Sequence, residues 1–530
     1  MRTRHAIVAV LLSVGAAMVA AQAPRFDLVI RGARVVDGTG APWVLADVAI
    51  AGDTIVAVGR DLAGTAATTV DAAGKVVAPG FIDIHTHARR GIFVVPTADN
   101  YVRQGVTTVV EGPDGSSPLP IAAFLAKVEA VRIVPNFATF VGQGSVREKV
   151  MGNVDRPATA AELATMKDIV RQAMRDGAFG LSTGLLYVPG TFTPTAEVVA
   201  LAAEAGALGG IHISHMREEA SRVLDSVNET IRIGEEGHLP TQVTHHKIVG
   251  KGNWGRSIET LRAMEAARAR GVDVTIDQYP YTASSTGISV LFPRWALEGT
   301  DADVTGRIAD PAQRAKIKAA IIENLEFDRG GGDPKNVQIA NCPWDSSMAG
   351  KTLADLVLAK GETVSYATAA DVVIEIVRRG GAQGIFHAID EADLRRILAS
   401  PLTMVASDGE VPVFGQASPH PRSYGTFVRV LGRYVRDERV LTLEEAVRKM
   451  TSFPAARMGL ADRGILRPGM KADLVVFDPE RVGDRATFEQ PHQYAVGIDR
   501  VFVNGTQVFD GSTMSAARPG RVLRRPAATR

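Results

Sequence analysis

The sequence contains a single cysteine, Cys342, and has no excess of either charge. A lone cysteine cannot form an intrachain disulfide, so the fold must be stabilised by packing and by any bound metal. The 59 Lys and Arg residues balance the 58 Asp and Glu residues, which argues against nucleic acid or an anionic membrane as a partner. With 46% hydrophobic residues, 530 residues are enough for one large domain and smaller modules.

Long hydrophobic runs are also scarce, and the run near the amino terminus is too short for a good membrane span. A basic start precedes this run, which covers residues 6–20 and is followed by small residues. The pattern is typical of a secretory signal peptide over residues 1–23, cleaved after Ala21 or Ala23, with an uncleaved anchor as the alternative. We therefore expect a periplasmic or secreted protein with no stable membrane span after cleavage.

Both ends of the chain contain short β-like runs that close with Gly or Asp-Gly turns. These runs fill residues 24–77, and runs of the same kind recur within residues 441–514 after a closing helix. We expect the two parts to form one small β-sandwich domain. The tail, residues 515–530, is basic and contains proline, so it is predicted to be disordered.

Residues 78–440 alternate buried strands with amphipathic helices, such as those predicted over residues 159–177 and 220–237. Apolar strands that alternate with helices indicate a parallel sheet, and eight such strands indicate closure into a (β/α)8 barrel. The gap between strands seven and eight, about 287–400, is too long for a bare loop. It predicts an inserted lid or subdomain.

Histidines and carboxylates follow several of these strands. In "PGFIDIHTH", His85 and His87 are two residues apart, so on a strand both imidazoles point to the same side. The other residues of this kind at strand ends are Glu111, Asp114, His215, His245, His246 and Asp408. Active sites of such barrels lie at the carboxyl ends of the strands, where these side chains would meet.

A mixed set of histidines and carboxylates suits zinc acting as a Lewis acid on water, and hydrolysis is the natural reaction. Asp408 would take the proton from the attacking water and return it to the leaving nitrogen. The alternative reading is structural, because Asp114 and Asp408 each precede a glycine and can shape turns.

On these residues the chain resembles the amidohydrolase superfamily and, within it, the D-aminoacylase (N-acyl-D-amino-acid deacylase) family. The resemblance covers nearly everything after the signal segment, with specific stretches such as "APGFIDIHTH", "DGAFGLSTGLLYVPG", "HISHMREE", "DQYPYTASST" and "HPRSYGTFVRVLGRYV". It implies a metal-bearing (β/α)8 barrel with a β-sandwich built from both chain ends.

The resemblance also implies roles for individual residues. His215 and His245 would hold the tightly bound zinc ion, and His85, His87 and Asp408 would form a second metal position. The residues implied around the substrate carboxylate are Lys247 and Arg422, with Tyr279 and Ser285 lining the same pocket. One or two zinc ions are therefore expected.

The chain departs from the family pattern at two places. Asp114, in "GPDG", stands where the family typically has a cysteine that bridges the metals, and Glu111 is the rival bridging ligand. After "HTH", acidic residues common in the family are replaced by Ala88, Arg89 and Arg90. A lysine is also absent from the end of strand four, "GLSTG", where related enzymes carry a carboxylated one.

The leading prediction is a zinc-dependent hydrolase that cleaves the amide of small N-acyl-D-amino acids with a free carboxylate. The alternatives are opening of a cyclic amide, as in dihydropyrimidinase or dihydroorotase, and cleavage of an unusual dipeptide. A binding protein that has kept the fold and lost the chemistry is a further alternative, because fold alone does not determine function.

Overall fold

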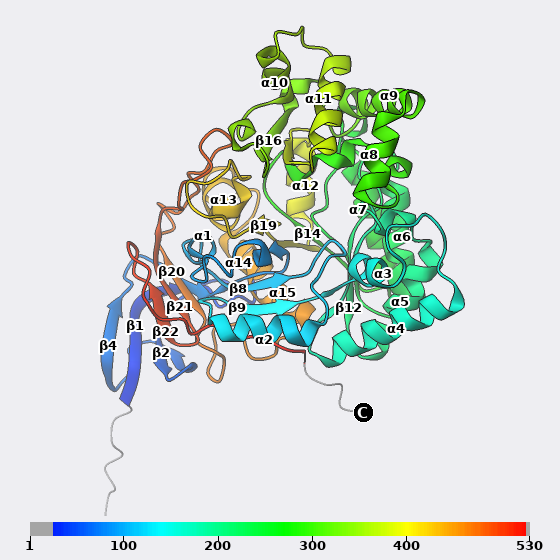
Figure 1. Ribbon diagram of the computed structural model, residues 1–530. Helices are drawn as coiled ribbons and strands as arrows, with labels where there is room; N and C mark the ends of the chain where they lie inside the picture. Colours follow the sequence, from blue (N-terminus) through cyan, green and yellow to red (C-terminus); the bar gives the residue numbers. More distant parts are fainter. Residues whose placement is uncertain (1–24, 526–530) are drawn as a thin grey trace, which may run out of the picture.

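The computed structural model describes residues 25–525 (Figure 1), so the predicted signal peptide lies outside the described residues. The fold is α/β: a series of parallel strands connected by helices, together with one mixed sheet and a smaller antiparallel sheet. Within residues 25–525, none of the helices combines the length and the apolar character needed to cross a bilayer.

The parallel strands come from eight stretches of the chain, each where the sequence pattern predicts a strand. In chain order they are β6 (Phe81–Asp83) with β7 (Thr86–His87), β8 (Val106–Glu111), β9 (Asn136–Thr139) with β10 (Val141–Gly142), β11 (Gly180–Gly184), β12 (Ile211–His215), β13 (Thr241–Val243), β14 (Val274–Gln278), and β18 (Thr403–Val405) with β19 (Gly409–Glu410). The pairing runs β6-β8-β9 and β10-β11-β12-β13-β14-β18, and β19 pairs in parallel with β7. The last stretch therefore lies beside the first.

Helices connect these strands. They are α2 (Ile121–Val131), α3 (Gln143–Met151), α4 (Ala160–Arg175), α5 (Thr195–Ala207), α6 (Val223–Glu236), α7 (Ser257–Ala269) and α12 (Glu391–Ala399). Helix α4 illustrates why they form where predicted: Thr159 and Glu162 make a capping box at its start. Its buried residues Met166, Val170 and Ala173 follow helical spacing and form one face.

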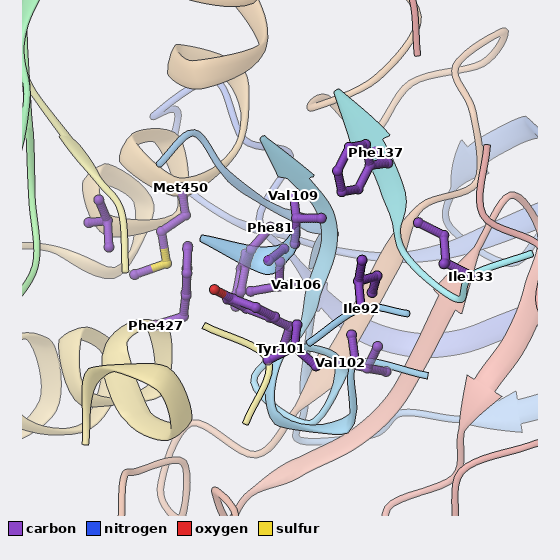
Figure 2. Close-up of a cluster of buried hydrophobic side chains, with 14 of the residues drawn as sticks. Phe81, Ile92, Tyr101, Val102, Val106, Val109, Ile133, Phe137, Phe427 and Met450 are labelled. Atoms are coloured by element: carbon purple, nitrogen blue, oxygen red, sulfur yellow. The ribbon is translucent and has the colours of Figure 1, made fainter. Parts of the chain in front are cut away.

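A large apolar core surrounds the first strands (Figure 2). Phe81 of β6 stacks on Phe427 with ring centroids 5.7 Å apart. Phe427 lies in α13 (Arg422–Arg429), which leads through a π-helical stretch (Val430–Asp437) to α14 (Leu443–Met450) and α15 (Ser452–Met458). This packing fixes β6, and therefore the two histidines that follow it.

Strands from both chain ends share one eight-stranded sheet, drawn in blue and in orange to red in Figure 1. Its strands are β1 (Arg25–Val35), β2 (Val44–Ala51), β3 (Thr54–Gly59), β4 (Thr65–Asp71), β5 (Val76–Pro79), β20 (Leu474–Phe477), β21 (Ile498–Val503) and β22 (Thr506–Phe509). The junction between the two ends is the antiparallel pairing of β20 with β5. Since β5 leads directly into β6, this sheet is continuous with the start of the parallel strands.

The long segment between β14 and β18 has its own core. It contains the antiparallel strands β15 (Ser284–Gly287), β17 (Gln383–Phe386) and β16 (Val337–Asn341), with helices α8 (Asp301–Ala309), α9 (Pro311–Phe327), α10 (Leu353–Ala359) and α11 (Tyr366–Arg378). Helix α12 packs on α7 and β18, so it continues the alternating series. The predicted insertion, about 287–400, thus begins slightly earlier, at Ser284, and ends before α12.

The prediction of a disordered tail is wrong for residues 515–525. The backbone N–H of Phe137 donates to Arg521, and that of Leu523 donates back to Phe137 at 2.7 Å. Val522 and Leu523 also pack against buried apolar side chains. The prediction rested on the basic, proline-containing composition of the segment. Composition does not reveal the backbone hydrogen bonds that the segment makes with Phe137 of β9 in the folded chain. Residues 526–530 lie outside the described residues.

A buried polar network joins the mixed sheet to the parallel strands. Asp473, which precedes β20, pairs with Arg463 at 2.5 Å and accepts a hydrogen bond from the Asn136 side chain of β9 at 3.0 Å. It also accepts from the backbone N–H of Asn504 at 2.7 Å. One carboxylate thus satisfies three donors from separate parts of the chain.

We predict that Asp473→Ala lowers the free energy of unfolding by about 3 to 5 kcal/mol, because Arg463 loses its buried partner and the buried donors of Asn136 and Asn504 lose their acceptor. Asp462→Ala is the matched control: Asp462 also contacts Arg463, at 3.1 Å, but is half exposed, so its loss should cost less than about 1 kcal/mol. Guanidinium unfolding followed by circular dichroism measures both. Equal, small losses in the two variants would contradict the prediction.

Candidate metal centre

Two groups of histidines and carboxylates lie at the carboxyl ends of the parallel strands and share Asp114. One group contains His85, His87, Asp114 and Asp408, and the other contains Asp114, His215 and His245. Within each group the donor atoms lie within 4.8 Å of one another. The structure therefore brings together residues that are more than 300 positions apart in the chain.

In the first group, the Nε2 atoms of both histidines face carboxylate oxygens. His87 Nε2 lies 3.0 Å from Asp408 Oδ1 and 3.4 Å from Asp114 Oδ2. His85 Nε2 lies 3.5 Å from Oδ1 of each of the same two aspartates. The histidines come from the β6–β7 segment and Asp408 precedes β19, so the pairing of β19 with β7 sets their separation.

In the second group, His245 Nε2 lies 3.4 Å and His215 Nδ1 lies 3.7 Å from Asp114 Oδ1. The two imidazole nitrogens are 2.7 Å apart. Asp114 therefore directs Oδ1 at His85, His215 and His245 and Oδ2 at His87. One carboxylate thus belongs to both donor groups.

Three of these residues have left-handed backbone conformations, with φ of 55° at Asp114, 36° at His245 and 52° at Asp408. Such conformations are uncommon for non-glycine residues and often accompany function. At Asp114 the turn is further constrained because a Cβ on Gly115 would lie 2.6 Å from the backbone nitrogen of Gly184. The turn reading of "PDG" from the sequence is thus correct, and the same turn presents the carboxylate.

The donor set fits a metal ion. Within residues 25–525, His85 Nε2, Asp114 Oδ1 and Asp408 Oδ1 are buried and have no hydrogen-bond partner. Buried polar atoms are normally paired, so atoms left unpaired on one side of a cluster indicate a ligand there. Ligands about 2.0 to 2.2 Å from zinc in a tetrahedral arrangement lie roughly 3.3 Å apart, which is close to the separations observed.

The electrostatics of the cluster also favour a cation. Burial opposes ionisation of Asp114, but the nearby His85 and His245 outweigh it and hold the pKa of Asp114 well below its usual value. Burial is likewise outweighed at Asp408, where Arg422 and His85 hold the pKa well below the usual range. Burial lowers the pKa of His215 to about 4. At His85, His87 and His245 burial is outweighed by the neighbouring carboxylates, which raise the pKa, so these imidazoles would release a proton on binding a metal.

Two further carboxylates lie behind the histidines. Asp277 of β14 lies 3.5 Å from His85 Nδ1, and Glu219 lies 3.4 Å from His245 Nδ1. Carboxylates in this position orient metal-binding imidazoles. Sequence analysis missed both, because Asp277 lies within a strand and Glu219 in a loop, and only the residues at strand ends were selected.

Arg422 occupies the centre of the expected substrate region. Its Nη1 lies 2.8 Å from Asp408 Oδ2, its Nη2 donates to the Ser285 carbonyl at 3.2 Å, and its guanidinium lies 4.8 Å from the Tyr279 ring centroid. The Tyr279 hydroxyl is buried and makes no hydrogen bond within the described residues. These three residues lie together, and Arg422 and Ser285 line a cavity whereas Tyr279 does not.

Lys247 is placed differently from the expectation. Its ammonium lies 2.5 Å from Glu219 Oε1, 2.8 Å from His245 Nδ1 and 2.9 Å from the His245 carbonyl oxygen. Two of the three N–H donors of the ammonium have acceptors in Glu219 and in the His245 carbonyl. Lys247 is also buried and does not line the cavity beside the donor groups, so it is held beneath His245 and away from a substrate.

Glu111 and His246 are outside both groups. Glu111 accepts a hydrogen bond from the backbone N–H of Arg89 at 2.8 Å, which corrects the expectation that it rivals Asp114 as the bridging ligand. His246 Nε2 lies 2.8 Å from the Thr260 hydroxyl, and burial lowers the pKa of its imidazole to about 3. His246 lies beyond the end of β13, after a turn in which His245 has a left-handed backbone, and this turn directs the two imidazoles to different partners.

A cavity opens over the donor groups. It is lined by residues that follow several parallel strands and by residues of the inserted segment. Its lining includes His87, Arg89, Arg90, Asp114, Tyr187, Ser285, Gln383 and Arg422. The two arginines that replace acidic residues of the family are partly neutralised, because Arg90 pairs with Glu410 and Arg89 lies 3.5 Å from Glu111. A small molecule in this cavity would contact the candidate metal ligands directly.

Comparison with known proteins agrees with the site. The amidohydrolase family model matches residues 68–324 and 348–509. D-aminoacylase of Alcaligenes xylosoxydans xylosoxydans is 38% identical over 527 residues, covering 95% of this chain and 98% of that protein. N-acyl-D-aspartate deacylase of the same organism is 35% identical over 521 residues, covering 94% and 95%.

Solved structures give the same picture. N-acyl-D-glutamate deacylase from Bordetella bronchiseptica, crystallised with zinc and a phosphonate inhibitor, superposes with a TM-score of 0.81 at 38% identity, covering 95% of this chain and 100% of that one. A crystal structure of D-aminoacylase gives 0.81 at 37% identity, covering 94% and 100%. The family model spans well over half of the sequence, and the relatives match it from end to end. The chain therefore belongs to the amidohydrolase family.

Proposed function

We propose that this protein is a zinc-dependent hydrolase that cleaves the amide bond of N-acyl-D-amino acids. The observation that carries the proposal is the pair of histidine and aspartate groups that share Asp114 beneath a cavity. The chain that presents them is 38% identical to a D-aminoacylase and to an N-acyl-D-glutamate deacylase, each over 95% of its length.

His215, His245 and Asp114 would hold one zinc ion, and His85, His87, Asp408 and Asp114 would hold a second. Zinc bound there would supply Lewis acid chemistry, polarising the amide carbonyl and making water nucleophilic at neutral pH. All four histidines are buried, and His87 and His215 also lie at paired positions of their strands, which fixes these ligand positions.

Asp408 is the proton carrier in this proposal. Its pKa is held well below the usual range, so it begins as a carboxylate that can accept a proton from the attacking water. It then gives this proton to the nitrogen that leaves. Asp408 lines a second cavity, which shares Ser285 and Arg422 with the first, so a substrate that spans the two would lie within its reach.

Arg422 would bind the substrate carboxylate, with its guanidinium oriented by the Ser285 carbonyl and by the ring of Tyr279. A guanidinium matches a carboxylate with two parallel hydrogen bonds, and Arg422 lines the cavity. Because Lys247 is buried and does not line the cavity, we assign the recognition of the carboxylate to Arg422 and give Lys247 a supporting role.

We also propose that the eight parallel stretches close into a (β/α)8 barrel. The parallel pairing of β19 with β7, together with the hydrogen bond from the Asp408 N–H to the His85 carbonyl at 2.9 Å, supports closure. The sheet shared by both chain ends supports the small β-sandwich domain, and the inserted segment, which lines the cavity through Ser285 and Gln383, would cover the site.

Export to the periplasm or outside the cell is part of the same proposal. It is supported by the basic start, the short apolar run and the small residues of segment 1–23. Sequencing the amino terminus of the protein secreted by cells that express the full chain would locate a cleavage after Ala21 or Ala23.

The main test is hydrolysis of N-acetyl-D-amino acids by the purified protein, with their L-forms and hydantoins as comparison substrates. We expect release of the D-amino acid, its loss on treatment with a chelator, and recovery when zinc is added. Ring opening of hydantoins without deacylation would instead favour a cyclic amidase. A protein that takes up no zinc and hydrolyses none of these compounds would contradict the proposal.

Asp408→Asn should lower kcat about 10²- to 10⁴-fold, because the amide cannot accept the proton from water. Zinc bound by His215 and His245 should remain, since Asp408 is outside that group. Steady-state kinetics and elemental analysis measure the two properties on one preparation. Wild-type kcat in this variant would assign proton transfer to another residue.

Arg422→Lys should reduce the preference for a substrate with a free carboxylate over its carboxamide analogue. The expected fall in the ratio of the two kcat/KM values is roughly 10- to 100-fold, since a charge-assisted hydrogen bond contributes about 1.5 to 3 kcal/mol. Because both substrates are measured with the same variant, any effect of the substitution on Asp408 alters both kcat/KM values alike and cancels in their ratio. Arg429→Lys is the control, because Arg429 pairs with Asp484 and does not line the cavity. An unchanged ratio in Arg422→Lys would refute the assignment.

A further inference from the structure

One buried carboxylate, that of Glu219, lies behind both histidines of the second donor group. Its Oε1 is 3.4 Å from His245 Nδ1, and its Oε2 is 3.9 Å from His215 Nε2. These are the ring nitrogens that face away from Asp114. Glu219 itself has no exposed side-chain surface and does not line the cavity.

The position of Glu219 favours one tautomer of His245. A neutral imidazole binds a metal through the nitrogen that carries no proton, so the other nitrogen must carry it. His245 directs Nε2 at the donor cluster, and its Nδ1–H then needs an acceptor, which Glu219 Oε1 provides at 3.4 Å. At His215 the separation of 3.9 Å between Nε2 and Oε2 is too long for a hydrogen bond, so Glu219 acts on His245.

Lys247 is the competitor in this arrangement. Its ammonium lies 2.8 Å from His245 Nδ1, and donation of a proton to that nitrogen would favour the tautomer with Nε2–H, which cannot bind a metal. Glu219 holds the same ammonium at 2.5 Å through Oε1. The carboxylate therefore both accepts from His245 and draws Lys247 toward itself.

The other carboxylate oxygen of Glu219, Oε2, accepts a hydrogen bond from a residue outside the alternating strands and helices. Arg329 Nη2 donates to Oε2 at 2.9 Å, and Arg329 follows α9 in the inserted segment. Arg329 is buried, with 6% of its surface exposed, so this contact is shielded from water. The inserted segment thus reaches the back of the second donor group through one ion pair.

We infer that Glu219 is a positioning residue that sets the metal-binding tautomer of His245, and that Arg329 of the inserted segment fixes it. This inference rests on the proposed function only in that it takes this histidine to bind zinc. It assigns the insertion a second role beside covering the cavity, because the insertion also supports the ligands from behind.

The test compares zinc affinity, measured by chelator competition on the full chain, in the wild type and three variants. Glu219→Gln should weaken zinc binding about 10- to 100-fold, as loss of the carboxylate behind a ligating histidine does. Arg329→Met, which leaves the Lys247–Glu219 pair intact, should weaken it by about 10-fold. Glu218→Gln is the matched control: Glu218 accepts from the backbone N–H groups of Ala220 and Arg222 and should leave zinc affinity and activity unchanged.

A second measurement separates positioning from general damage to the fold. At saturating zinc, the KM of Glu219→Gln for an N-acyl-D-amino acid should equal that of the wild type, since Glu219 does not line the cavity. If Glu219→Gln alone fails to fold, because two buried cations lose their partner, the double variant with Arg329→Met leaves only one such cation and is measured instead.

The outcomes are distinguishable. Zinc affinity in Glu219→Gln or the double variant equal to that of the wild type would overturn the role of Glu219. An Arg329→Met variant with wild-type affinity would overturn the role of the insertion. A wild-type protein that binds no zinc would refute the proposed function, and with it the inference.

Discussion

The site depends on the placement of one carboxylate, that of Asp114, between two pairs of histidines. Four imidazoles from three different strand stretches face its two oxygens, at separations of 3.4 to 3.7 Å. The left-handed backbone at Asp114 makes this possible, and the close approach of Gly115 to Gly184 holds the turn in place. A shift of this turn would separate the two donor groups.

The parallel pairing of strands explains how distant residues reach this carboxylate. Each strand needs only local sequence information to form, and its carboxyl end then lies at the same edge as its neighbours' ends. For this reason the positions of His85, His87, His215, His245 and Asp408 could be predicted from apolar runs followed by polar residues. The partners behind them could not, because Asp277, Glu219 and Arg329 contact the histidines or each other only in the folded chain.

The same distinction accounts for the other differences from prediction. The tail over residues 515–525 has a composition typical of disorder, yet its backbone finds donors and acceptors at Phe137 and at Gly177. The assignment of Lys247 to the substrate was reasonable from its motif, whereas its actual partners, Glu219 and His245, depend on side-chain directions that a motif does not contain. Residues whose role depends on a single long-range neighbour are thus the ones that sequence patterns describe least well.

The donor shared by the two groups, the Asp114 carboxylate, differs chemically from the thiolate that typically bridges the metals in the D-aminoacylase family, which this chain resembles. A thiolate can be oxidised stepwise to sulfenic and sulfinic acids or captured in a mixed disulfide, and each product changes its value as a ligand. The Asp114 carboxylate is open to none of these reactions, and Cys342, the sole thiol, is buried in the inserted segment. The donor cluster of this protein therefore contains no group that peroxide or a disulfide exchange partner can inactivate through sulfur chemistry.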